Sequence, residues 1–204
     1  MVSPQTRLRR LQADYASMQQ LVADSDLITF TANGQPPDRY VVTYRCKGLV
    51  KHGTRVQVSE HHQVEIALHQ QYPDTAPQLR HLTPIFHPNF QGAYICINAH
   101  DWTPRESLVD LVLRLGNMIV YRNYNPGSPL DPEAAQWAQR NQSRFPLDER
   151  GWLRDLSQDG DLPITILSDG SGVRGRQSPT ADDDIHIEIL STRHAEDDFD
   201  IRIL

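Results

Sequence analysis

The chain has 204 residues and a formal net charge of −6, which is enough length for one sizeable core plus an extension. Its two cysteines, Cys46 and Cys96, form no Cys-x-x-Cys pair, which excludes a disulfide framework and a cysteine-based zinc site. No apolar run approaches the roughly 20 residues that span a bilayer, and the first ten residues lack the apolar stretch of a signal peptide. We therefore expect a soluble, cytoplasmic protein in a reducing compartment, with no membrane partner.

The net negative charge is concentrated at the C-terminal end. Residues 161–204 contain ten Asp or Glu and four Arg, whereas residues 1–160 contain sixteen of each sign. This acidity argues against nucleic acid as a partner. From residue 158 onward the composition is rich in Gly, Ser and Asp without apolar periodicity, which is typical of a flexible linker. We predict a folded core over residues 1–157 and an acidic linker and tail over residues 158–204.

The first predicted element is a helix over residues 7–22. Its apolar residues recur at steps of three and four, so one stripe should face the core and the arginines should stay in solvent. The predicted buried stripe is Leu8, Leu11, Tyr15, Met18 and Val22, and the predicted exposed arginines are Arg7, Arg9 and Arg10.

Three alternating segments then predict strands of an antiparallel meander, at residues 38–46, 54–58 and 63–69. In the first of them Cys46 shares a face with three apolar or aromatic residues, so we expect it to be a small buried hydrophobe. The segment 72–79 contains two prolines that stop the third strand, and it is predicted to be an extended loop.

The clearest helix pattern lies within residues 101–121, with its apolar residues on one face. Two starts compete, because Thr103 with Glu106 and Ser107 with Asp110 both form a capping-box pattern. A turn-rich segment follows, and Pro132 is expected to begin a short helix over residues 132–142. Residues 147–156 are predicted to form one more.

Several motifs then occur together in chain order. The segments "YPDTAPQLRHLTPIFHPNFQGAYICINAHDWTP" and "NPGSPLDPEAA" resemble the core of the ubiquitin-conjugating enzyme family. That family's pattern is Tyr-Pro, a further Pro, His-Pro-Asn, a Gly before the active cysteine, Trp-x-Pro, and Asn-Pro-x-x-Pro-Leu. The matching residues are Tyr72, Pro73, Pro77, His87, Pro88, Asn89, Gly92, Cys96, Trp102, Pro104, Asn125, Pro126, Pro129 and Leu130.

The resemblance is close over residues 64–137 and implies an α+β fold. That fold has an N-terminal helix, a four-stranded antiparallel meander, a central helix behind the sheet and short C-terminal helices, which here precede the acidic extension. The elements expected from periodicity occur in the same order.

The resemblance also implies a chemistry. The family cysteine accepts a ubiquitin-like protein from an activating enzyme as a thioester and loses it to an amine on a protein substrate, and Cys96 is the matching position. Asn89 matches the residue that steadies the loop and is proposed to stabilise the oxyanion, two roles that require the same side chain. Ser128 stands where many members carry an Asp that receives the incoming lysine.

Other motif residues are implied to structure the loops around Cys96. These are His87, Pro88, Trp102 and Pro104. Although a His near a reactive Cys suggests a Cys–His nucleophile, the His-Pro pair of this family is a structural turn, so we do not expect His87 to be a general base.

Some positions depart from the family pattern. Asp74 replaces a Phe that usually contacts RING-type ligases, which weakens the expected docking of such a ligase. Ser128 can form a hydrogen bond but supplies no charge. These departures fit a divergent member, of the kind found in prokaryotic conjugation operons.

Two other functions compete with that of an active conjugating enzyme. A non-catalytic adaptor of the same fold would bind a ubiquitin-like protein, but the presence of both Cys96 and Asn89 argues against it. A thiol hydrolase would require a local protease signature around Cys96, and none is found. We expect no cofactor, and no metal site, because the sequence has neither His-Glu-x-x-His nor a cysteine pair.

Two surfaces are predicted to bind partners. On the first helix, Arg7, Arg9 and Arg10 are expected to face the activating enzyme. The tail holds three Ile-x-Ile-Leu runs, two of which follow acidic clusters, and such runs add a strand to the sheet edge of a ubiquitin-like protein or pair within the chain itself. The tail residues proposed to bind are Ile187, Ile189, Leu190, Ile201, Ile203 and Leu204.

Overall fold

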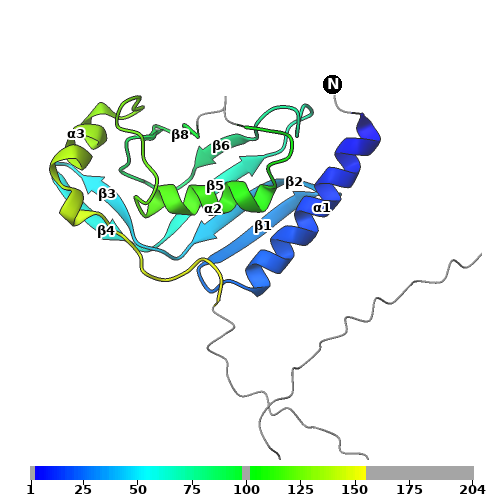
Figure 1. The fold of residues 1–204 in the computed structure, drawn as a ribbon, viewed down its shortest axis with the longest axis horizontal. Coiled ribbons are helices and arrows are strands. Elements are labelled where there is room, and N and C mark those ends of the chain that lie inside the picture. The colour runs from blue at the N-terminus through cyan, green and yellow to red at the C-terminus, as the bar shows by residue number, and fades with distance from the viewer. Residues whose placement is uncertain (1–2, 98–101, 155–204) are drawn as a thin grey trace, which may run out of the picture. The chain divides into compact units, whose positions relative to one another are not determined.

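The computed structural model describes residues 3–97 and 102–154, so the predicted linker and tail lie outside the described residues. Figure 1 shows the arrangement of the helices and strands. In chain order the elements are α1 Pro4–Ala23, β1 Ile28–Gly34, β2 Pro37–Tyr44, β3 Gly48–His52, β4 Arg55–Ser59, β5 His62–Ala67, β6 Gln78–His81, β7 Phe90–Gln91, β8 Tyr94–Ile95, α2 Leu108–Ile119, α3 Pro132–Arg140 and the 3-10 helix η2 Gln142–Arg144.

The predicted four-stranded antiparallel meander is present, but two of its strands are interrupted. Its second strand is divided into β2 and β3, and its third into β4 and β5. The main sheet has the order β1-β2-β5-β6-β8-β7, and β3 pairs with β4 in a separate two-stranded sheet. Pairing between β2 and β5 ends at Tyr44 opposite His62 and resumes in the β3–β4 hairpin at Gly48 opposite Ser59. The buried His62 ring lies against Gly48, where any Cβ would come within 2.5 Å of it.

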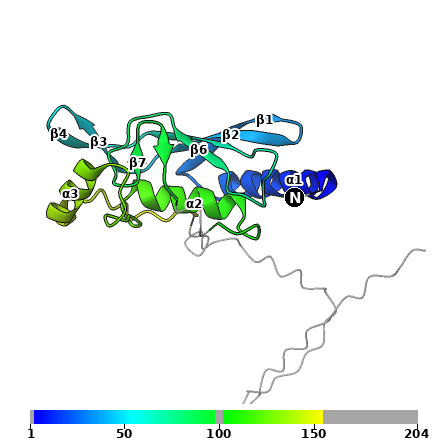
Figure 2. The same ribbon diagram turned by 90° about the horizontal axis from the view of Figure 1, so that it is seen from above.

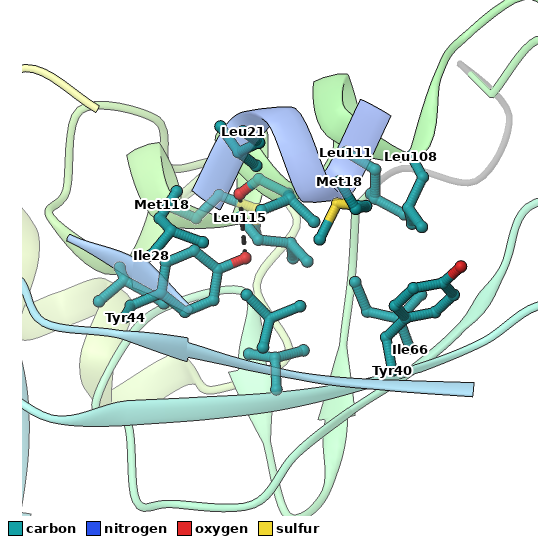
Figure 3. Close-up of a cluster of buried hydrophobic side chains, with 14 of the residues drawn as sticks. Met18, Leu21, Ile28, Tyr40, Tyr44, Ile66, Leu108, Leu111, Leu115 and Met118 are labelled. Carbon is teal, nitrogen blue, oxygen red and sulfur yellow. Dashed lines mark hydrogen bonds between the residues drawn. The ribbon is translucent and has the colours of Figure 1, made fainter. Parts of the chain in front are cut away.

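The helices lie on one face of the sheet (Figures 1 and 2). Buried side chains from α1, α2 and the strands meet between the two layers (Figure 3). Each large apolar side chain buried there contributes roughly 1.5–3 kcal/mol of transfer free energy. The polar end of Tyr44 is satisfied as well, because its hydroxyl donates to the carbonyl oxygen of Val112 over 3.0 Å. This packing fixes α2 across the middle of the sheet, where its outer surface reaches the region of Cys96.

The first helix is rotated relative to the prediction. Leu8 is 45% exposed, whereas Leu11, Met18 and Leu21 are buried together with the carboxylate of Asp14. A buried carboxylate requires a partner, and an arginine of the same helix supplies it. Arginines of α1 therefore point inward, where they also donate to neighbouring carbonyl groups.

Arg10 is the main partner of Asp14. Its guanidinium lies 2.8 Å from the Asp14 carboxylate and donates to the Tyr72 hydroxyl and to the carbonyl oxygens of Pro104 and Glu106. Arg7 is similarly engaged, since its guanidinium donates to the carbonyl oxygens of residues 68 and 69 after β5. The expectation that Arg7 and Arg10 stay in solvent is therefore wrong, whereas Arg9 is exposed.

The structure also decides the start of α2. Ser107 is the N-cap, its side chain accepts from the Asp110 amide, and the Asp110 carboxylate accepts from the Ser107 amide. The Asp110 carboxylate also accepts from the Ser107 hydroxyl over 2.7 Å, and this bond, together with the one from the Ser107 amide, holds the pKa of Asp110 below its usual range. The start at Thr103 is not used. Within the described residues, no helix combines the length and the apolar character that crossing a membrane requires.

The predicted helix over residues 147–156 is absent from its described part, residues 147–154. The carboxylate of Asp148 instead accepts from the guanidinium of Arg150 and from the Lys47 amide. Residues two apart do not face each other on a helix, so this pairing requires an irregular backbone. Trp152 then packs against α2 and donates to the side chain of Asn117 over 2.8 Å.

Candidate active site

Cys96 lies at the end of a tight hairpin. Strand β7 pairs with β8, and Gly92 at the turn has φ +60°, a conformation that favours glycine. The Cys96 amide donates to the carbonyl oxygen of Asn89 over 2.9 Å, which extends the pairing by one more step. The sequence indicated only a turn-rich loop here, and the structure shows that the loop is a hairpin placing Cys96 opposite Asn89.

The side chain of Asn89 ties this hairpin to the segment between α2 and α3. Asn89 is buried, its Oδ1 accepts from the Asn125 amide over 2.8 Å, and its Nδ2 donates to the Asn125 carbonyl oxygen over 3.2 Å. A second contact of Nδ2, with the Ser128 carbonyl oxygen, is 3.5 Å long, beyond the roughly 2.7–3.2 Å of ordinary hydrogen bonds. One proton of the Asn89 amide is therefore only weakly engaged.

Main-chain hydrogen bonds join the same two segments. The carbonyl oxygen of Pro88 accepts from the amides of Leu130 and Asp131 over 2.8 and 3.0 Å. Asp131 is also the N-cap of α3, where its side chain accepts from the Ala134 amide. The hairpin that carries Cys96 and the start of α3 thus form one connected unit.

The ring of His87 is completely buried below this unit. Its Nδ1 accepts from the Asn89 amide over 3.0 Å, and its ring contacts those of Phe90 and Tyr121. Burial lowers the pKa of His87 to about 3, so the ring is neutral near neutral pH. With its acceptor nitrogen occupied by a backbone amide, His87 has no free lone pair to act as a base toward Cys96.

Trp102 and Pro104 anchor the segment that follows Cys96. Trp102 Nε1 donates to the carbonyl oxygen of Pro73 over 2.8 Å, and its ring lies 6.0 Å from that of Tyr72. The carbonyl oxygen of Pro104 accepts from Arg10. The start of the 102–107 segment is therefore attached both to the loop before β6 and to α1.

A hollow of about 540 Å³ opens beside Cys96, which is half-buried. Both the hairpin and α2 contribute to it, as does the segment after α2. Its lining residues are Asn89, Cys96, Ile97, Arg114, Met118, Asn123, Tyr124, Asn125 and Ser128. Sequence reasoning missed Arg114, although the single basic residue inside the apolar pattern of α2 was a signal that could have identified it.

A second hollow, of about 360 Å³, lies on another side of Cys96. Its lining is mostly apolar and comes from β6, β8 and the loops around them: Ala76, Pro77, Leu79, Tyr94, Ile95, Cys96, Ile97 and Leu130. Cys96 therefore has access to two spaces of different polarity.

The other cysteine has a different environment. Cys46 is completely buried in the main core, where burial raises the pKa of its thiol to about 12. A thiol that stays protonated and inaccessible is not a nucleophile.

The remaining predicted site residues are dispersed. Arg7 and Arg10 are engaged in internal contacts on α1, Arg9 is exposed, and the six tail residues lie outside the described part of the chain. Among residues 3–97 and 102–154, no group of three or more His, Cys, Asp or Glu side chains is arranged to hold a metal ion.

Comparison with known proteins identifies the family. The family model for the ubiquitin-conjugating enzyme matches residues 48–150, which is half of the chain. This range includes the hairpin and every residue that lines the 540 Å³ hollow. The chain belongs to the ubiquitin-conjugating enzyme family. This agrees with the resemblance seen in its motifs and with the α+β fold.

Curated relatives match only in part. The chain is 26% identical over 100 residues to ubiquitin-conjugating enzyme E2 2 of Kluyveromyces lactis, covering 45% of this chain and 60% of that protein. It is 38% identical over 82 residues to probable ubiquitin-conjugating enzyme E2 31 of Arabidopsis thaliana, covering 39% and 51%. It is 30% identical over 94 residues to human ubiquitin-conjugating enzyme E2 T, covering 44% and 48%. The chain thus spans about half the length of the curated relatives it matches.

Solved structures support the fold. A structure described as a ubiquitin-conjugating enzyme from Plasmodium yoelii matches with a TM-score of 0.50 and 21% identity, covering 70% of this chain and 88% of that one. Another, titled a novel ubiquitin-conjugating enzyme, matches with a TM-score of 0.50 and 20% identity, covering 66% and 86%. At these identities the likeness concerns the fold alone.

Proposed function

We propose that the protein is an active conjugating enzyme in which Cys96 carries a ubiquitin-like protein as a thioester. The observation that carries this proposal is the position of Cys96 in a member of the family, opposite Asn89 and open to two hollows. In the charging step the Cys96 thiolate attacks the thioester carbonyl that the activating enzyme presents. The new Cys96 thioester forms as the activating enzyme's thiol leaves, so no net oxidation occurs.

In the second step an amine, a lysine of a protein substrate, attacks the Cys96 thioester. The amide bond forms, the amine loses a proton, and the Cys96 thiolate leaves. Negative charge develops on the carbonyl oxygen, and an amide donor aimed at it contributes roughly 3 kcal/mol. We assign this donor to the weakly engaged proton of Asn89, while Ser128 lines the approach of the amine.

The partners follow from this chemistry. The activating enzyme would dock on α1, where Arg9 is exposed to a partner. Arg7 and Arg10 would contribute indirectly, because their internal contacts hold the helix in place. Asp74 is exposed where an apolar residue would suit a RING-type ligase, so we do not expect such a ligase to be the standard partner. We expect a conjugating enzyme of this kind to act in the cytoplasm.

The test of this proposal is a charging assay. The protein is incubated with a cognate activating enzyme, ATP and the ubiquitin-like protein, and an adduct removable by a thiol reductant is expected. Cys96→Ala should abolish the adduct and the matched variant Cys46→Ala should leave it intact, because only Cys96 is accessible. Equal loss in both, with folding preserved by circular dichroism, would exclude the assignment. Binding of the ubiquitin-like protein without any adduct would favour the non-catalytic adaptor.

We also propose that the Ile-x-Ile-Leu runs of the tail hold the ubiquitin-like protein near Cys96 and raise its effective concentration there. Deleting residues 161–204 should then leave the core folded and chargeable but slow charging at limiting concentrations. Charging at the full-length rate would show that the tail does not dock a partner. Unfolding of the truncated protein would show that the runs pair with the core instead.

A further inference from the structure

One charged group lies among the polar side chains of the larger hollow beside Cys96. Of the described residues that line this hollow, Arg114 alone carries a fixed charge. The amides of Asn123 and Asn125 and the hydroxyl of Ser128 offer neutral donors and acceptors around it. Among the described residues, the lining of the hollow therefore has a positive centre and no carboxylate.

The contacts of Arg114 leave part of its guanidinium unused. One nitrogen is bonded to the carboxylate of Glu106, which precedes α2 and does not line the hollow. The Nε atom is buried, and among the described residues it has no hydrogen-bond acceptor. A buried donor without a partner costs free energy, and an acceptor that reached this nitrogen would remove that cost.

We propose that Arg114 selects the C-terminal tail of the ubiquitin-like protein, favouring a tail with an acidic residue near its end over one with a basic residue. This inference rests on the proposed function, because it assigns the tail of the thioester-bound protein to the hollow next to Cys96. The neutral amides pair with the main chain of an extended tail, and Arg114 reads the charge of one side chain.

The alternative occupant of the α2 side of the hollow is the attacking amine. An ammonium group would meet a like charge there, and none of the described lining residues supplies a carboxylate to orient it. Arg114 comes from α2 and Ser128 from the segment between α2 and α3, so the two approach the hollow from different elements. The tail thus lies along α2, and the amine enters past Ser128.

The test uses synthetic peptide thioesters, so that no activating enzyme is needed. Each pentapeptide carries a mercaptoethanesulfonate thioester and ends in two glycines, so no side chain hinders the reacting carbonyl. The third, fourth or fifth residue from the end is Glu, Gln or Arg. Transfer to Cys96 of the full chain is followed by intact mass, with release of the small thiol. We expect transfer about 10-fold faster with Glu than with Arg at one of these positions, and a smaller ratio in high salt.

Variants of the arginine separate its charge from its structural role. Arg114→Lys keeps the charge and should keep the preference, whereas Arg114→Gln should reduce the ratio to within about twofold. Arg140→Gln is the matched control, because Arg140 is an exposed arginine at the end of α3 and does not line the hollow. Glu106→Gln removes the competing carboxylate and should increase the preference for Glu.

The outcomes distinguish the two proposals. Suppose the wild-type chain accepts the Glu, Gln and Arg peptides at equal rates, whichever position carries the varied residue. That result would overturn the role of Arg114 while leaving Cys96 reactive. No transfer from any probe, with Cys96 still titratable by a small thiol reagent, would overturn both. Should Arg114→Gln fail to fold, the preference of the wild-type chain and of Arg114→Lys still decides the question.

Discussion

Replacing Asn89 by Ala should lower the stability of the fold and, separately, slow the transfer from Cys96 to an amine. Asn89 makes two hydrogen bonds of ordinary length with the backbone of Asn125, and it is 4% exposed. At roughly 0.5–1.5 kcal/mol each, their loss should lower the free energy of unfolding by about 1–3 kcal/mol. If its amide also donates to the oxyanion, transfer from the charged Cys96 to free lysine should slow by about 100-fold.

Two assays measure these effects independently. Urea unfolding gives the change in stability, and single-turnover discharge of the purified thioester gives the chemical step without the charging reaction. Charging of Asn89→Ala should still go to completion, because the hairpin hydrogen bond of Cys96 involves the main chain of residue 89 and not its side chain.

A second variant separates the donor from the acceptor of this side chain. Asn89→Asp keeps an oxygen that can accept from the Asn125 amide but has no amide proton to donate. It should discharge as slowly as Asn89→Ala. Discharge within twofold of the wild type by both variants would refute the oxyanion role, and Asn89 would then serve only to hold the segment after α2.

Three further predictions concern the stability of the folded core. Asp14→Ala should cost about 3–5 kcal/mol in urea unfolding, because it removes one partner of a buried ion pair; a loss below about 1 kcal/mol would contradict this. Since burial lowers the pKa of His87 to about 3, the unfolded chain binds a proton there below about pH 6.5 that the folded chain does not. Stability should therefore fall as the pH drops from about 6.5 toward 3, by at most about 1.4 kcal/mol per pH unit, and His87→Gln should flatten this slope. Gly116→Ala would place a Cβ 2.8 Å from the Trp152 ring, so we expect altered tryptophan emission and a loss of about 1–3 kcal/mol, whereas Gly127→Ala in an exposed loop should change stability by less than about 0.5 kcal/mol.

Much of the fold could be predicted from local patterns. The alternation at Tyr40, Val42 and Tyr44 predicted the buried face of β2. The apolar positions predicted for one face of α2 are buried as expected: Leu108, Leu111, Val112, Leu115 and Ile119. Local hydrogen-bonding chemistry also identified Ser107 as one of two candidate starts of α2. These features depend on neighbours within one turn or one strand, which the sequence displays directly.

The errors arose where a distant partner decides the outcome. Asp14 and Arg10 look like surface charges on a helix, and only the sheet and the 102–107 segment around them make them a buried pair. Asp148 and Arg150 likewise replace a helix by an irregular segment through a contact with Lys47, about a hundred residues earlier in the chain. The place of Arg114 in the hollow depends on the packing of α2 against the sheet, which periodicity alone does not define.

The main chain, more than the side chains, holds Cys96 in position. The carbonyl oxygen of Asn89 accepts from the Cys96 amide, and that of Pro88 accepts from the amides of Leu130 and Asp131 just before α3. Because these bonds do not depend on which side chain each residue carries, Tyr94, which is 75% exposed, can be randomised without displacing the thiol. A library at this position, with Asn89 and Pro88 kept, would vary the surroundings of Cys96 while leaving its main-chain hydrogen bonds in place.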